Sequence, residues 1–254
     1  MVPRQSRPYL GCDFFYLKGD NMQEYFNMFN HYVKTFDFKD KMIRNKFHHT
    51  YRVMEYAEEI AESLNVDTFK AKLCALFHDI GRFEQWKNYQ TFSDFESIDH
   101  GDLGCKIINN HFNDIPNKDL ILFTTKNHNK LNIPNNNEEY ELYTKIIRDA
   151  DKLDIMIEQS NEINDDYFYL KDEIVYTVFQ NKMVKNELLE HEVDHIIRLI
   201  CFIFDINFKY TFKYLLDKKV IENKIHLLKC YIEDDRLEKI EKHLIEYINK
   251  KVEE

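Results

Sequence analysis

Apolar residues recur every three or four positions along most of the chain, and this spacing constrains the fold more than any other feature. Between Val53 and Leu64 they lie on one helical face with glutamates opposite, and the stretch from Leu237 to Val252 repeats the pattern. The sequence contains only five glycines and four prolines, so few residues interrupt helices. No alternating pattern typical of strands competes with this periodicity. The sequence therefore predicts an all-α protein.

The composition is typical of a globular protein. Hydrophobic residues make up 44% of the 254 positions and aromatic residues 15%, which argues against disorder and allows a sizeable core. The five cysteines are widely spaced without a CxxC pair and indicate free thiols in a reducing compartment. The apolar runs are too short to span a bilayer, and no signal peptide is visible. A net charge of −10 disfavours binding to long nucleic acids. We therefore expect a cytoplasmic protein that does not bind membranes.

Residues 1–21 differ from the rest of the chain because prolines and glycines break any periodicity there. Two interpretations stay open for this segment: an ordered arm, or an upstream extension without a role in the fold. A helical pattern begins at Met22, and no long linker follows it. We therefore expect a helical core over 22–160, with the helices of 161–254 packed on the same domain.

One apolar stretch, from Leu73 to Phe77, leads directly into the sequence His78-Asp79-Ile80-Gly81. This pattern places an imidazole and a carboxylate at the buried end of a helix. A charged carboxylate is costly to bury unless a cation lies beside it, and a divalent metal is the partner that we expect. Gly81 is expected to end this helix in the left-handed conformation.

Further histidines and aspartates are candidates for the same metal site. His49 shares the inward face of a predicted amphipathic helix, and Asp151 lies among apolar neighbours on another, whereas Asp149 points the opposite way. His100 opens one helical segment, and His128 lies near the end of a second. Taken singly, each residue is more often structural, as a helix cap, a solvated histidine or part of a surface acidic cluster. Their recurrence at helix ends and inward faces favours a shared site.

The ordered set of His49, His78-Asp79 and Asp151 resembles the signature of the HD superfamily of metal-dependent phosphohydrolases. The local sequences are similar as well: His-Thr-Tyr-Arg-Val at the first histidine, His-Asp-Ile-Gly at the pair, and Asp-Ala-Asp-Lys-Leu-Asp at the last ligand. The similarity covers about residues 40–160, and the remainder is similar to small bacterial HD-domain proteins. The resemblance implies a single helical bundle of the HD-domain type with additional C-terminal helices.

The resemblance also implies a metal site and its ligands. The two histidines between the pair and the last aspartate are similar to those of the binuclear branch of cyclic-nucleotide and cyclic-dinucleotide phosphodiesterases, with Asp79 as the bridge. Such mixed donors suit one or two ions of Mn, Fe, Co, Ni or Zn, and Mg is also compatible. The chain lacks the Gly-Tyr-Pro typical of cyclic-di-GMP phosphodiesterases and the Glu-Asp pair typical of stringent-response hydrolases. The implied ligands are His49, His78, Asp79, His100, His128 and Asp151.

The implied activity is hydrolysis of a small phosphoester, with a nucleotide as the expected substrate, by attack of metal-bound hydroxide on phosphorus. We expect Asp79 at the metal, and Arg82 and Lys152 on the phosphate oxygens. Surface salt bridges are the alternative for both cations. Glu84 or Asp102 would move protons.

Several alternatives remain compatible with the sequence. The aromatic residues Trp86, Tyr89 and Phe92 either stack on a nucleobase or pin a long loop to the core. An HD-fold protein with two irons would oxygenate a small organic substrate instead of cleaving a phosphoester. A non-catalytic helical sensor or partner-binding domain is a third function, although the complete ligand set argues against it. A homo-oligomer is compatible with the sequence.

Overall fold

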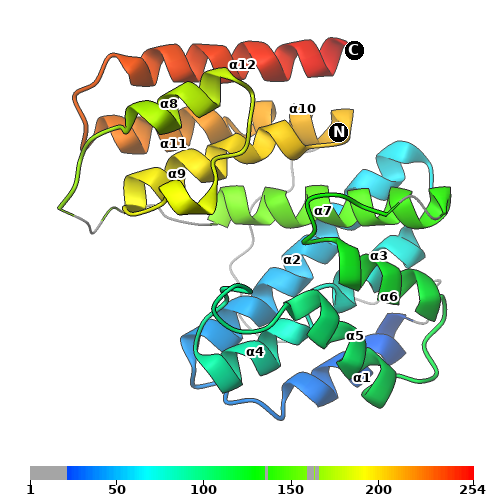
Figure 1. Ribbon diagram of the computed structural model, residues 1–254. Coiled ribbons are helices and arrows are strands. Elements are labelled where there is room, and N and C mark those ends of the chain that lie inside the picture. The colour runs from blue at the N-terminus through cyan, green and yellow to red at the C-terminus, as the bar shows by residue number, and fades with distance from the viewer. Residues whose placement is uncertain (1–21, 135–136, 159–162, 164–165) are drawn as a thin grey trace.

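The computed structural model describes residues 22–134, 137–158, 163 and 166–254 (Figure 1). These residues form helices and contain no strand, which confirms the predicted all-α class. The predicted arm or extension of residues 1–21 lies outside the described residues. The helices are α1 (Met22–Val33), α2 (Lys41–Leu64), α3 (Thr68–Phe77), α4 (Gly81–Tyr89), α5 (His100–His111), α6 (Lys118–Asn127), α7 (Glu138–Glu158), α8 (Asp172–Phe179), η1 (Asn186–Leu188), α9 (Glu192–Ile200), η2 (Cys201–Asp205), α10 (Lys209–Asp217), α11 (Val220–Lys229) and α12 (Arg236–Glu253).

The long helix α7 runs through the middle of the molecule, with α1–α6 on one side and α8–α12 on the other (Figure 1). It packs against α2, α3 and α6 in the first group, and against α9, α10 and η2 in the second. One hydrophobic cluster extends from Phe29 and Phe77 to Leu215 and Leu244. The two groups therefore share a core, and the boundary near residue 160 stays a prediction.

Aspartates are the N-cap residues of three helices: α2 and α5, which carry candidate ligands, and α3, which ends just before His78. Asp40, Asp67 and Asp99 accept hydrogen bonds from backbone amides in the first turns of α2, α3 and α5. Each carboxylate pairs amides that helix geometry leaves without a partner, and it lies at the positive end of the helix dipole. These caps fix where each helix begins, and thereby the register of its histidines.

Gly81 does not end the helix before it, so the expectation of a left-handed helix end was wrong. It is the first residue of α4, and α3 ends at Phe77. A steric constraint explains the glycine instead. A Cβ atom at this position would meet the carbonyl oxygen of His100 and lie 2.8 Å from the amide nitrogen of Gly104. The backbones of α4 and α5 touch here, and this contact brings His100 beside Asp79.

The two aspartates of Asp149-Ala150-Asp151 serve opposite sides of α7. Asp149 is fully buried and accepts hydrogen bonds of 2.8–3.1 Å from the backbone of Asn207 and Phe208, the Asn207 amide and the Thr211 hydroxyl. It therefore holds the segment just before α10, together with Thr211 in the first turn of that helix, from a distant part of the chain. Burial raises the pKa of Asp149 to about 6. This carboxylate ties α7 to the C-terminal helices.

We expect Asp149→Ala to lower the free energy of unfolding by about 2–4 kcal/mol, because it leaves several buried donors unpaired. Urea unfolding at a pH above about 6, where the carboxylate is ionised, measures the change. Asp217→Ala, at an exposed position of α10, is the matched control and should change stability by less than about 0.5 kcal/mol. Equal stability of the two variants would contradict the role of Asp149 as the acceptor that ties α7 to Asn207, Phe208 and Thr211.

Candidate metal centre

The carboxylate of Asp79 is shared between two pairs of histidines. Its Oδ2 atom lies 3.4 Å from His49 Nε2 and 3.8 Å from His78 Nε2. Its Oδ1 atom lies 3.3 Å from His100 Nε2 and 3.5 Å from His128 Nε2. All five side chains are buried. They form two groups of potential metal ligands that have Asp79 in common.

Each of the four imidazoles is held through its Nδ1 atom by a carbonyl or carboxylate oxygen. An acceptor at Nδ1 holds a ring proton there, so that Nε2 faces the centre of the cluster and offers a lone pair whenever the ring is neutral. The acceptors are Asp154 Oδ2 for His49, Ala75 O for His78, Asp94 Oδ2 for His100 and Thr125 O for His128, at 2.6–2.9 Å. The imidazoles are therefore oriented as metal ligands require.

Unpaired polar atoms show that the cluster fits a metal ion. The Nε2 atoms of His100 and His128 face each other at 3.1 Å, and two lone pairs repel at this distance unless a cation or proton lies between them. His49 Nε2, His78 Nε2 and Asp151 Oδ1 are buried and form no hydrogen bond. Such atoms are costly in a folded protein. Neutral imidazoles and carboxylates are donors that suit divalent transition metals, so the residues present fit one or two ions.

Asp151 lies on the face of α7 that meets this cluster. Its Oδ1 atom is 3.1 Å from His49 Nε2 and 3.9 Å from His78 Nε2. One turn later, Asp154 accepts hydrogen bonds from His49 Nδ1 and from Arg52, whose Nε atom is 2.5 Å away. No role was predicted for Asp154, although its spacing of three from Asp151 places both on one helix face. Helix α7 therefore brings one candidate ligand and one group that orients His49.

Arg82, expected on the phosphate, reaches the site but is engaged by the segment that follows α4. Its Nη1 atom donates to Phe92 O at 2.6 Å and Asp94 Oδ1 at 2.9 Å, and its Nε atom lies 3.6 Å from Asp79 Oδ1. Asp94 also holds His100. Asp94 lies outside any periodic pattern, so no sequence signal pointed to it. Arg82 orders this side of the site, and its binding of phosphate stays a prediction.

The remaining residues with predicted catalytic roles are Lys152, Glu84 and Asp102, and each contacts groups outside the cluster around Asp79. Lys152 extends to η2, where its Nζ atom is 2.8 Å from Asp205. Glu84 lies near Tyr32 of α1 and raises the pKa of that phenol, after the larger effect of burial. Asp102 is half exposed at the start of α5. None of these contacts includes a candidate metal ligand.

The aromatic residues after the dyad mainly secure the segment between α4 and α5. Trp86 donates its indole N–H to Asp40 at 2.7 Å, and its ring packs 5.0 Å from that of Phe92. Phe92 also lies 5.3 Å from Lys46 Nζ and 5.8 Å from the guanidinium carbon of Arg82. These contacts favour the interpretation that Trp86 and Phe92 pin a loop to the core, whereas Tyr89 is 49% exposed.

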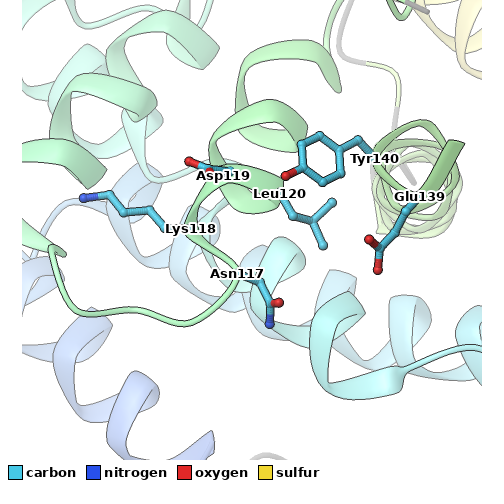
Figure 2. Close-up of a pocket in the computed structure, with 6 residues that line it drawn as sticks. All are labelled: Asn117, Lys118, Asp119, Leu120, Glu139 and Tyr140. Carbon is cyan, nitrogen blue, oxygen red and sulfur yellow. The ribbon is translucent and has the colours of Figure 1, made fainter. Parts of the chain in front are cut away.

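A separate hollow lies between the start of α6 and the start of α7 (Figure 2). Its volume is about 310 Å³. The residues that line it are Asn117, Lys118, Asp119, Leu120, Glu139 and Tyr140. Because none of them belongs to the cluster around Asp79, this hollow is distinct from the candidate metal centre.

Burial and charge give the histidines of the cluster different protonation states. Burial lowers the pKa of His78 to about 4 and also lowers that of His100, so both are neutral near pH 7. Burial and the nearby Lys46 oppose protonation of His49 as well. The carboxylates of three neighbouring aspartates outweigh these effects and raise the pKa of His49 to about 10. A metal ion bound by His49 must therefore displace a proton.

The comparison with known families identifies this region. Residues 47–156 match the family model of the HD domain. This part of the chain is an HD domain. The matched range contains all six predicted ligands, from His49 to Asp151, and it confirms the resemblance found in the sequence.

Relatives of the HD domain carry the name Ribonuclease Y. The protein of that name from Ureaplasma parvum serovar 3 is 39% identical over 77 residues, which are 30% of this chain and 14% of the relative. That from Mycoplasmoides gallisepticum is 29% identical over 131 residues, 48% of this chain and 21% of the relative. The chain thus spans about a fifth or less of these proteins. No solved structure matches it. The HD domain and these relatives support a metal-dependent hydrolase.

Metal binding should release about one proton for each ion that His49 ligates, because the free imidazole stays protonated up to a pH of about 10. Affinity should therefore rise with pH, by up to about tenfold per unit, and level off above this value. Calorimetry of Mn²⁺ binding in buffers of different ionisation enthalpy counts the protons.

His31→Gln, at an exposed position of α1, is the control and should release the same number of protons as the wild type. Binding of Mn²⁺ without any proton release would contradict the assignment of His49 as a protonated ligand.

Proposed function

We propose that the protein is a metal-dependent phosphohydrolase that cleaves a phosphoester bond of a nucleotide. The observation that carries this proposal is the carboxylate of Asp79, shared between two pairs of buried Nε2 atoms. A metal held by these residues would lower the pKa of a bound water and polarise the phosphoryl group. The proposed ligands are His49, His78, Asp79, His100, His128 and Asp151.

The residues around the ligands would prepare the site for this chemistry. Asp154 and Asp94 hold the rings of His49 and His100 through Nδ1. These two histidines therefore lose little rotational freedom when they bind a metal. Arg82 fixes Asp94 and adds positive charge near Asp79. Such charge favours the phosphate oxygens in the transition state of phosphoryl transfer.

An RNA phosphodiester is the second candidate substrate, because the relatives of the HD domain are named Ribonuclease Y. The net charge of −10 weakens electrostatic attraction to a long phosphate backbone. We therefore favour a nucleotide or a short oligonucleotide over a long RNA. A single active centre of this kind suits either a phosphomonoester or a phosphodiester.

The proposed location is the cytoplasm. Cys74, Cys105, Cys201 and Cys230 are free thiols, which supports a reducing compartment. Among the described residues, no helix has the length and apolar character that crossing a membrane requires.

A substrate screen of the Mn²⁺-loaded protein tests the proposed function. The substrates are nucleoside monophosphates, a cyclic dinucleotide, bis-p-nitrophenyl phosphate and a short single-stranded RNA. Asp79→Asn should lose about a hundredfold or more of any hydrolysis, because it weakens both ligand groups at once. Asp119→Asn, at the exposed hollow of Figure 2, should retain the wild-type rate.

Hydrolysis that survives in Asp79→Asn would contradict the proposed site. Oxygen consumption by the iron-loaded protein, without any phosphoester cleavage, would favour the di-iron oxygenase instead. Cleavage of the RNA but of no smaller substrate would favour the second candidate.

A further inference from the structure

A cation of the chain itself contacts the proposed bridging carboxylate. Lys46 Nζ lies 2.8 Å from Asp79 Oδ2, whereas His49 Nε2 and His78 Nε2 lie 3.4 Å and 3.8 Å from the same atom. Lys46 is one turn before His49 on α2, which places both side chains on one helix face. The ammonium therefore occupies the oxygen that faces the first pair of histidines.

We propose that Lys46 is an internal counter-ion that a metal displaces from Asp79, and that the released ammonium then binds the substrate phosphate. This inference rests on the proposed metal site. Asp79 is only 4% exposed, and a carboxylate in such a place requires a nearby cation. A divalent ion and an ammonium in contact with one oxygen repel each other strongly where water is scarce. Metal binding would therefore weaken the attraction that holds the Lys46 ammonium at Asp79.

The surroundings of Lys46 allow its ammonium to move. Its side chain is 19% exposed, against 5% for that of Asp79, so it enters the site from the solvent side. Four methylene groups separate the charge from the backbone and give it a long reach. The ring of Phe92 lies 5.3 Å from Nζ and offers the cation a second favourable neighbour beside Asp79. A displaced ammonium would thus remain where an anionic substrate arrives.

Arg82 is less suited to this movement. Its Nη1 atom already donates to Gln85, Phe92 and Asp94. Breaking these bonds would also release Asp94, which holds His100. The guanidinium is therefore a fixed charge, whereas the Lys46 ammonium donates a hydrogen bond to a proposed metal ligand, Asp79. A phosphate that enters beside Phe92 would meet a mobile ammonium as well as the fixed charge.

The first test compares metal affinity in Lys46→Met, Lys46→Arg and Lys41→Met, the last at an exposed position of the same helix. Calorimetry with Mn²⁺ and metal-free protein at constant pH gives the dissociation constants. Lys46→Met should bind Mn²⁺ about tenfold more tightly than the wild type, because no cation competes for Asp79. Lys46→Arg and Lys41→Met should stay close to the wild type. Circular dichroism verifies that each variant is folded.

The second test measures the binding of inorganic phosphate to the Mn²⁺-saturated proteins. Lys46→Met should bind phosphate about tenfold more weakly than the wild type and Lys41→Met, because the released ammonium is missing. A role of Lys46 in folding alone would not produce tighter metal binding together with weaker phosphate binding.

Three results would overturn the inference. Equal or weaker Mn²⁺ affinity in Lys46→Met would show that Lys46 does not compete with the metal. Unchanged phosphate affinity would show that the released ammonium does not bind the substrate. Absence of metal binding in the wild type would remove the proposed centre itself. If metal binds but no substrate is cleaved, the proposed function fails while the affinity comparison still decides the role of Lys46.

Discussion

The burial of the Asp79 carboxylate among four imidazoles is the constraint on which the rest of the site depends. A carboxylate in this position is stable only with positive charge beside it, and Lys46 and protonated His49 provide it in the metal-free protein. Each imidazole is also held in place by an acceptor at Nδ1. The helices that carry these groups therefore converge on one point, and the packing of α2–α7 holds them there around Asp79.

Helix α7 connects this centre to the C-terminal helices. Asp151 and Asp154 face the histidines, whereas Asp149, on the other side of the same helix, accepts hydrogen bonds from the segment before α10 and from Thr211. Arg148 and Lys152 bind Asp205 of η2. The C-terminal helices therefore fix the rotation of α7 about its axis, and this rotation decides whether Asp151 faces the cluster. Residues beyond the HD domain contribute to the site in this way without supplying a ligand.

The sequence predicted well those features that depend on one helix at a time. Helical periodicity places His49 and Asp151 on inward faces, and the apolar run before His78 indicates that the dyad is buried. Prediction from the sequence failed where two segments that are distant along the chain pack against each other. Gly81 was expected to end a helix, but its role follows from the contact between α4 and α5, which no local pattern reveals. Asp94 lies in a segment without periodicity, so its bond to His100 could not be foreseen.

The sequence by itself determined the all-α class, the buried histidine–aspartate pair and the set of groups able to bind a metal, because hydrophobic spacing and residue chemistry are local properties. Only the tertiary structure decided how these groups meet. It directed four Nε2 atoms at one carboxylate, placed Lys46 on Asp79, and turned Lys152 towards Asp205. These outcomes depend on the angles and distances between helices, which are set by packing across the whole core.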